Sequence, residues 1–179
     1  MRNILKKLNN RIGSSLVETL ATVVLLGLMG IALVTGIATI QNTYNKIVRK
    51  ANEQTVLSTT LIEMRNEIRK SVDYDATKGR FHSKDGYWFS FRNANKEKGE
   101  KGIRIDYYMT KDATTPTQTR PVVSEANGDV SKVYSSFGGI IPVAGSSGVF
   151  EIKNLKVGNG TDNETILSSY KVKQITSRK

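Results

Sequence analysis

A single carboxylate stands inside a long apolar stretch near the start of the chain. From Leu16 to Ile40 the only charged residue is Glu18, and the small residues Gly13, Ser14 and Ser15 come directly before this stretch. A charged side chain at the centre of a bilayer costs about 2.5–3.5 kcal/mol on insertion scales, and such a residue usually has a partner. The first chemistry that the sequence suggests is therefore charge pairing in an apolar medium, at Glu18.

The other reactive residue types do not predict a catalytic centre. The sequence contains no cysteine, which excludes a disulfide, a thiolate nucleophile and a thiolate metal site. The only histidine, His82, lies in the turn-like segment FHSKDG, where a surface histidine is more common than a general base. The serines form neither a G-x-S-x-G elbow nor a phosphate-binding loop. We therefore predict a protein that is not an enzyme and carries no cofactor.

One polar loop has the oxygen-bearing residues that calcium prefers. Asn159 to Glu164 reads NGTDNE, which places several amide, hydroxyl and carboxylate oxygens close together. The spacing matches no EF-hand, and ordinary turns have the same composition. We predict a turn here and no metal site.

Aromatic and basic residues alternate around one predicted hairpin. Its strands are expected at 87–93 and 103–110, joined by the charged loop 94–102. Such residues can stack on bases and bind a phosphate backbone. The candidate DNA-binding residues are Tyr87, Trp88, Arg92, Lys96, Lys98, Lys101 and Arg104. In the alternative interpretation, Phe89 and Phe91 face the core while the lysines keep an edge and its loop soluble; the sequence leaves both open.

The apolar stretch and its flanks predict one membrane-spanning helix. As a helix, the 25 residues from Leu16 to Ile40 would be about 37 Å long, against a bilayer core of about 30 Å. The first 13 residues contain no acid and four basic residues, namely Arg2, Lys6, Lys7 and Arg11. Because basic flanks stay inside, we expect the N-terminus in the cytoplasm, a single pass through the cytoplasmic membrane and the remainder outside it. Membrane lipid is thus an expected partner.

The helix is expected to continue far beyond the membrane stretch. Residues 14–71 contain no proline, and their apolar residues keep a helical spacing. Two stripes can be recognised, one formed by Ile40, Tyr44, Ile47 and Ala51 and the other by Leu57, Leu61, Met64 and Ile68. At about 100° per residue the second stripe is displaced from the first by roughly a quarter-turn. Two successive partners are therefore expected, first something outside the domain and then the domain's own sheet.

Strand and turn signals replace the helical pattern from Asp73 onward. Besides the hairpin, strands are expected at KVYSSF, GVFEIKNLKV and ILSSYKVKQI, whereas TKDATTPTQTRP is expected to be a turn-rich excursion. A helix followed by four or five antiparallel strands is an α+β pattern. We therefore predict an α+β fold in which a long N-terminal helix, membrane-spanning and then amphipathic, packs on a C-terminal antiparallel β-sheet.

The N-terminal residues resemble the processing motif of type IV prepilins and pseudopilins. That motif has a short basic leader, a glycine, and a glutamate at the mouth of an apolar run, which this chain presents as Gly13 and then SSLVE. The resemblance implies that a prepilin peptidase cuts after Gly13 and N-methylates Ser14. It also implies that Glu18, the fifth mature residue, pairs with the N-terminal amine of a neighbouring subunit. Ser14 stands where the family most often has phenylalanine or methionine, which leaves its methylation open.

The resemblance also implies an architecture and a function. The expected parts are a cleaved leader 1–13, a transmembrane or filament-core helix 14–40, its amphipathic half 41–71 and an extracytoplasmic β head 72–179. Such a pilin-like chain would be a minor pilin or pseudopilin in a type IV pilus, a type II secretion pseudopilus or a DNA-uptake filament. Its partners would be other subunits, the prepilin peptidase, an inner-membrane platform protein and an assembly ATPase. The alternative is a signal-anchored cell-surface binding module that binds DNA through residues 87–104.

Overall fold

The computed structural model describes residues 2–124, 132–159 and 164–175, and side chains from residue 16 onward within these ranges except at residue 96. The chain forms two compact units, Met1–Ile47 and Val48–Lys179. We call the first the N-terminal unit and the second the head, and each is described by itself.

A single helix, α1 (Arg2–Lys70), crosses the N-terminal unit and enters the head. It ends within one residue of the expected position, but it begins in the basic leader and not at Ser14. Nothing in residues 2–13 opposes this extension, since they contain no proline and only one glycine.

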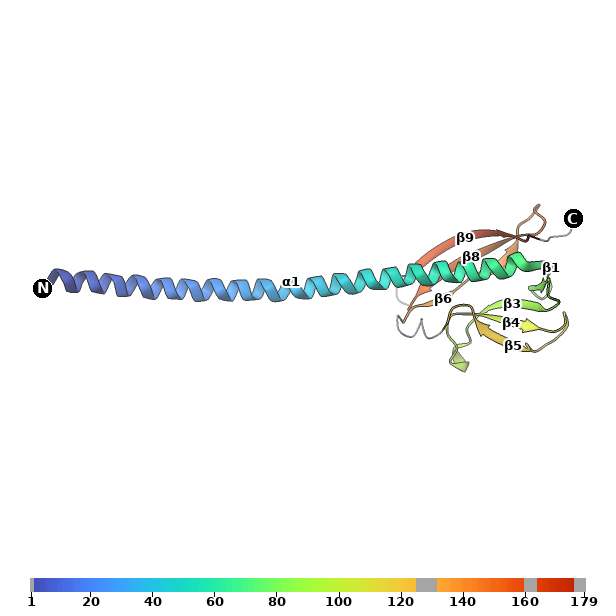
Figure 1. The fold of residues 1–179 in the computed structure, drawn as a ribbon, viewed down its shortest axis with the longest axis horizontal. Helices are drawn as coiled ribbons and strands as arrows, with labels where there is room; N and C mark the ends of the chain where they lie inside the picture. The colour runs from blue at the N-terminus through green and yellow to red at the C-terminus, as the bar shows by residue number, and fades with distance from the viewer. Residues whose placement is uncertain (1, 125–131, 160–163, 176–179) are drawn as a thin grey trace. The chain divides into compact units, whose positions relative to one another are not determined.

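Five strands of the head form an antiparallel meander in the order β1-β2-β3-β4-β5, here called sheet A. The strands are β1 (Ser71–Asp75), β2 (Arg80–Ser83), β3 (Trp88–Asn93), β4 (Ile103–Tyr108) and β5 (Gln118–Pro121). The expected hairpin is present, because β3 pairs with β4 from Trp88↔Tyr108 to Asn93↔Ile103. A short 3-10 helix, η1 (Lys96–Lys98), lies in its loop. Figure 1 shows β3, β4 and β5 side by side.

The second sheet, sheet B, is built around one long strand. Its strands are β6 (Tyr134–Ser136), β7 (Gly139–Pro142), β8 (Val149–Gly158) and β9 (Thr165–Lys173). Strands β6 and β7 pair with successive parts of β8, and β9 pairs with β8 along almost its whole length. Together, α1, sheet A and sheet B confirm the predicted α+β layout, although the strands are divided between two sheets.

The sequence patterns missed several short strands. β1 and β2 were not placed, β7 was not expected, and β5 lies inside the segment predicted to be a turn-rich excursion. β5 is the edge strand of sheet A, where Pro121 at its end is tolerated because an edge residue needs no donor on its open side. Strands this short are held by their neighbours in the sheet and leave little periodicity in the sequence.

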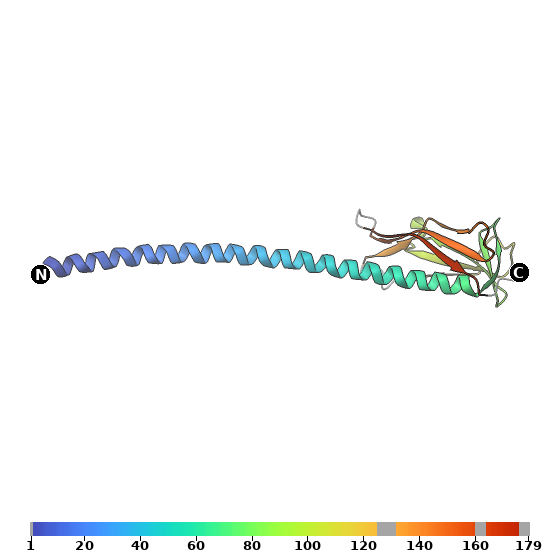
Figure 2. The same cartoon turned by 90° about the horizontal axis from the view of Figure 1, so that it is seen from above.

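The core of the head lies between one face of α1 and the inner faces of both sheets. Met64 and Ile68 are completely buried there, together with Phe81, Phe89, Ile103, Ile105, Phe150, Ile152 and Leu155. Leu57 and Leu61 are partly buried against the same cluster. The predicted second stripe of the helix therefore does face the sheets. Figure 2 shows the strands gathered along the C-terminal part of α1.

Polar contacts fix α1 to both sheets at two points. Glu53, only 1% exposed, accepts a hydrogen bond from Thr165 on β9, and Glu67 forms an ion pair of 2.9 Å with Arg120 on β5. Just beyond the helix, the amide of Gln174, which follows β9, donates to the hydroxyl of Ser71 at the start of β1. Because Thr165 and Arg120 lie on strands of different sheets, the two contacts define the position of the helix along the head.

We predict that Met64→Ala lowers the free energy of unfolding of the head by about 2–5 kcal/mol, because it leaves a cavity between the helix and the sheets. The measurement is urea unfolding of the full chain in detergent micelles, followed by the fluorescence of Trp88, the only tryptophan. The matched control is Ile62→Ala on the same helix, since Ile62 is 53% exposed and should cost less than about 0.5 kcal/mol. Equal losses for the two variants would contradict the packing described.

Candidate functional site

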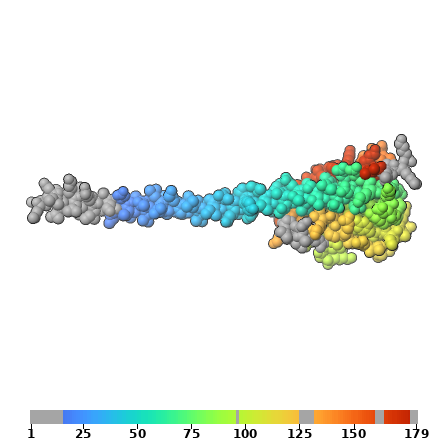
Figure 3. All heavy atoms as spheres, viewed as in Figure 1, coloured from blue at the N-terminus to red at the C-terminus, as the bar shows by residue number. Residues whose placement is uncertain are grey.

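The first part of the site is the apolar segment of α1 in the N-terminal unit. Every described side chain from Leu16 to Ile47 is exposed, and the large apolar ones from Leu16 to Ile40 are 55–69% exposed. Figure 3 shows this segment as the blue part of the chain. By length and composition it is the one helix of the described residues that is able to cross a membrane. Nothing in the segment is covered, which excludes the core helix of a soluble domain as the reason for its apolarity.

Hydrogen bonding within the helix separates Glu18 from the other polar side chains of this segment. All four threonines between Leu16 and Ile40 donate to a carbonyl one turn earlier; an example is Thr22, whose hydroxyl lies 2.7 Å from the Glu18 carbonyl oxygen. These hydroxyls need no outside partner in an apolar medium. The Glu18 carboxylate has no hydrogen bond or ion pair with any residue that the structure describes. Among the described side chains from Leu16 to Ile40, it is the one polar group without a hydrogen-bond partner.

The predicted processing residues lie at the start of the same helix. Gly13 and Ser14 have helical backbones within α1, and their side chains lie outside the described part. Cleavage after Gly13 stays a prediction.

The candidate DNA-binding hairpin has two different faces. Phe89 is buried and Phe91 packs against the core, whereas Trp88 and Arg92 lie on the outer face of sheet A. Trp88 is stacked on His82 with ring centroids 4.5 Å apart. One face of the hairpin thus packs against the core, as the alternative interpretation expected.

Two carboxylates neutralise the arginine at the centre of this outer face. Arg92 makes two hydrogen bonds to Glu100, of 2.5 and 2.9 Å, and one of 2.7 Å to Asp106. The hydrogen bonds that Arg92 donates to Glu100 raise the pKa of Arg92 even though partial burial opposes this. Arg92 binds and positions the hairpin loop, and its charge is already balanced within the head. Nothing in the sequence indicated that Glu100 pairs with Arg92, apart from its position in a charged loop.

The remaining candidate cations do not converge on one surface. Arg104 lies opposite Arg92, with its Nε 3.6 Å from Glu100, and Lys101 lies over the Tyr134 ring at 5.1 Å. Lys98 is exposed on η1, while the Lys96 side chain lies outside the described part. The structure therefore brings Arg92 and Arg104 together around a carboxylate and places Lys98 and Lys101 elsewhere. DNA binding by this set stays a prediction that the ion pairing does not favour.

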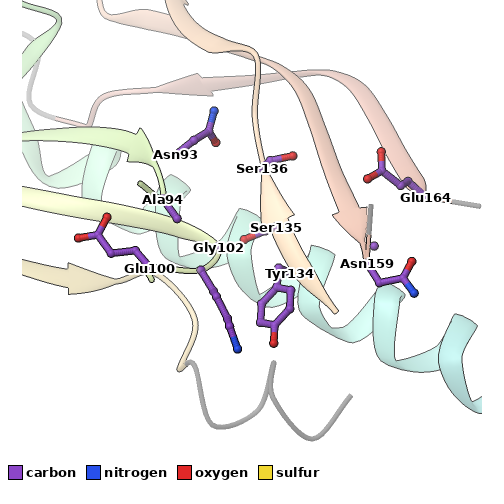
Figure 4. A pocket seen from close by; sticks show the side chains of 11 residues that line it. Asn93, Ala94, Glu100, Gly102, Tyr134, Ser135, Ser136, Asn159 and Glu164 are labelled. Atoms are coloured by element: carbon purple, nitrogen blue, oxygen red, sulfur yellow. The ribbon is translucent and has the colours of Figure 1, made fainter. Parts of the chain in front are cut away.

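A pocket of about 380 Å³ opens beside the hairpin loop, between the two sheets. Figure 4 shows its lining, which includes Asn93 and Glu100 from the hairpin, Tyr134 and Ser136 from β6, and Glu164 before β9. Among the residues that the structure describes, no group of three or more histidine or acidic side chains could hold a metal ion. Most of the loop considered for calcium lies outside the described residues.

Comparison of the chain with protein-family models, with curated proteins and with solved structures gave no match. The function of the chain is therefore inferred from its own residues.

We predict that the Glu100–Arg92 pair makes the stability of the head depend on pH in the acid range. The hydrogen bond from Arg92, with another from the Asn95 backbone, lowers the pKa of Glu100 from 4.5 to about 2. A carboxyl group whose pKa is lower in the folded state than in the unfolded state stabilises the fold at pH values above its unfolded pKa. For Glu100 this contribution is lost as the pH falls from about 4.5 to about 2. Glu100→Gln should lower the free energy of unfolding by about 1–3 kcal/mol at neutral pH and remove this part of its pH dependence.

Urea unfolding of wild type and variant between neutral pH and pH of about 2 tests this prediction. The control is Glu97→Gln, an exposed acid in the same loop, which should follow the wild-type curve. If the Glu100→Gln and wild-type curves ran parallel down to acid pH, the pair would not be coupled to folding.

Proposed function

We propose that the chain is a minor pilin or pseudopilin, inserted in the membrane through its apolar segment and assembled into a filament by helix packing. The observation that carries the proposal is Glu18, which has no partner among the described residues and lies in an exposed apolar segment whose threonines are all satisfied within the helix. An isolated anchor would be more stable in the membrane without this carboxylate. Its presence is explained if a second subunit supplies a cation.

The cation that fits this position is the N-terminal amine of a neighbouring copy. Cleavage after Gly13 would create a free amine at Ser14, one helical turn before Glu18 in the sequence. An amine and a carboxylate that are both in an apolar medium reduce each other's desolvation cost when they pair. Such a pair would also fix the stagger of neighbouring helices, because a shift of one turn separates the two groups.

The head is suited to be carried by such a helix. Within the head, the polar contacts of Glu53 and Glu67 hold the C-terminal part of α1 at one position against the sheets. In this proposal the head is extracytoplasmic and finally lies on the cell surface or pilus. A prepilin peptidase, a platform protein and an assembly ATPase would be the partners in the membrane and cytoplasm.

The second candidate is a signal-anchored surface module that does not assemble. The basic leader and the exposed apolar segment support it as well as they support a pilin. It gives no reason for Glu18, and we therefore place it second. The two proposals differ in two measurable properties, the N-terminus of the mature chain and the effect of Glu18.

We predict that the chain isolated from its native membrane begins at Ser14. Intact mass spectrometry with N-terminal sequencing should find the chain 13 residues shorter than the sequence, because a prepilin peptidase removes Met1 to Gly13. N-methylation would add the mass of one methylene. A chain that still begins at Met1 in cells with an active prepilin peptidase would exclude the pilin proposal and leave the anchored module.

We predict that Glu18→Ala lowers incorporation into surface filaments about tenfold or more, which corresponds to about 1.4 kcal/mol at each contact between subunits. The amount in the membrane should not fall, because removal of the charge favours insertion. The measurement compares immunoblots of the sheared filament fraction and the membrane fraction. The control is Thr22→Ala, one turn further along, whose hydroxyl is bonded within the helix and should be dispensable. Normal incorporation of Glu18→Ala would support the anchored module instead.

A further inference from the structure

The outer faces of the two sheets carry very different charge. On the outer face of sheet A the strands place three arginines, Arg80, Arg92 and Arg104, together with three aspartates, Asp73, Asp75 and Asp106. Two of the aspartates form ion pairs: Asp106 accepts a hydrogen bond from Arg92, and the Asp75 Oδ2 lies 3.5 Å from the Lys111 Nζ. Sheet A therefore presents a balanced surface.

The outer face of sheet B is basic. Its strands place four lysines there, Lys153 and Lys156 on β8 and Lys171 and Lys173 on β9. The one carboxylate among these outward strand residues is Glu151, which accepts a hydrogen bond of 2.5 Å from Ser169 and lies 4.0 Å from Lys153. Three of the four lysines are exposed and Lys156 is half-buried. We call these four residues the lysine face.

An unusual backbone conformation puts both lysines of β8 on the same side. Lys153 and Lys156 are three positions apart, so regular alternation would point them to opposite faces of the sheet. Asn154, between them, has a φ of 49°, in the left-handed region that asparagine tolerates better than most residues. The alternation reverses there, and Ile152 and Leu155 are both buried. The left-handed conformation of Asn154 therefore places Lys153 and Lys156 on the same face of sheet B.

The shape of the lysine face fits a linear polyanion better than a small anion. The four ammonium groups follow two paired strands of ten and nine residues, which extend for about 30 Å. By strand register they are spread along the sheet, since Lys173 lies opposite Val149 and Lys156 opposite Ile166, whereas the ligands of a single phosphate would converge. Large exposed aromatic side chains, which would stack on bases, are not among the outward residues of β8 and β9.

We infer that the lysine face binds the phosphate backbone of a nucleic acid, by charge alone and without reading its sequence. Lysine is a compact point charge that suits phosphate oxygens without fixing a geometry. Each contact releases counterions, so affinity should fall steeply with salt. This inference concerns the head alone and does not depend on whether the chain assembles. It also places the nucleic-acid contact on sheet B, away from the hairpin residues 87–104.

The test uses the full chain in nonionic detergent micelles and a short fluorescent DNA duplex of arbitrary sequence. Fluorescence anisotropy gives the Kd at salt concentrations between about 50 and 200 mM. One variant carries K153Q, K156Q, K171Q and K173Q, and the matched control carries K50Q, K70Q, K84Q and K132Q at exposed positions elsewhere. Both variants remove four positive charges, which changes the net charge from +11 to +7. The basic leader is present in both and cancels in the comparison.

We predict that the sheet B variant raises the Kd about tenfold or more and makes the slope of log affinity against log salt shallower by about 3. The control should change the Kd less than about threefold. Equal losses in both variants, or no loss in either, would overturn the inference, because binding would then follow net charge or involve other residues.

Two further measurements make the result decisive. Vesicles containing anionic lipid are tested with the same variants, because Ile141 and Ile166 are exposed on this face and could favour a membrane surface. Lysine-dependent binding to vesicles without binding to DNA would overturn the inference. Circular dichroism and Trp88 fluorescence establish that both variants are folded. If the fourfold variant does not fold, K171Q with K173Q on one strand, against K50Q with K84Q, repeats the comparison.

Discussion

One face of α1, between Glu53 and Ile68, is the surface on which the head is assembled. Met64 and Ile68 are completely buried there against residues of both sheets, so removal of this face would open the core that the sheets share. The sheets also contact each other directly, since the ring centroids of Phe81 and Phe150 lie 4.9 Å apart. Glu53, Thr60 and Glu67 are buried on the same face, seven residues apart. Since the two glutamates bind different sheets, they give the apolar contact one defined position.

The N-terminal unit has the opposite property, since none of its described side chains, Leu16 to Ile47, is buried. Its apolar side chains are exposed, and its threonines are satisfied by the helix itself. A segment of this composition is stable only where another apolar medium surrounds it, which a bilayer or neighbouring helices would supply. Glu18 then distinguishes between these media, because lipid tails offer no cation, whereas the proposed neighbouring subunit would offer one. The proposed filament role rests on this distinction.

Charge is distributed differently over the two sheets of the head. Arginines on sheet A are paired with nearby carboxylates and hold loops in place, as Arg92 holds the loop that contains Glu100. Lysines on sheet B face outward in a row and have one carboxylate among them. The excess positive charge of the protein is therefore not spread evenly over its surface. A basic patch of this kind is suited to an acidic partner, whereas the paired arginines are structural.

The sequence by itself determined the features that depend on neighbouring residues. The apolar run, Glu18, the stripe that ends in Met64 and Ile68, and the β3–β4 hairpin all follow from spacing and composition, because helix and hairpin geometry are local. Only the tertiary structure decided the division into two sheets and the short strands β1, β2, β5 and β7. It also decided which charges are neutralised. Glu53 meets Thr165 across 112 positions and Glu67 meets Arg120 across 53. Pairs so far apart leave no periodic signal, since the whole fold must form before they come into contact.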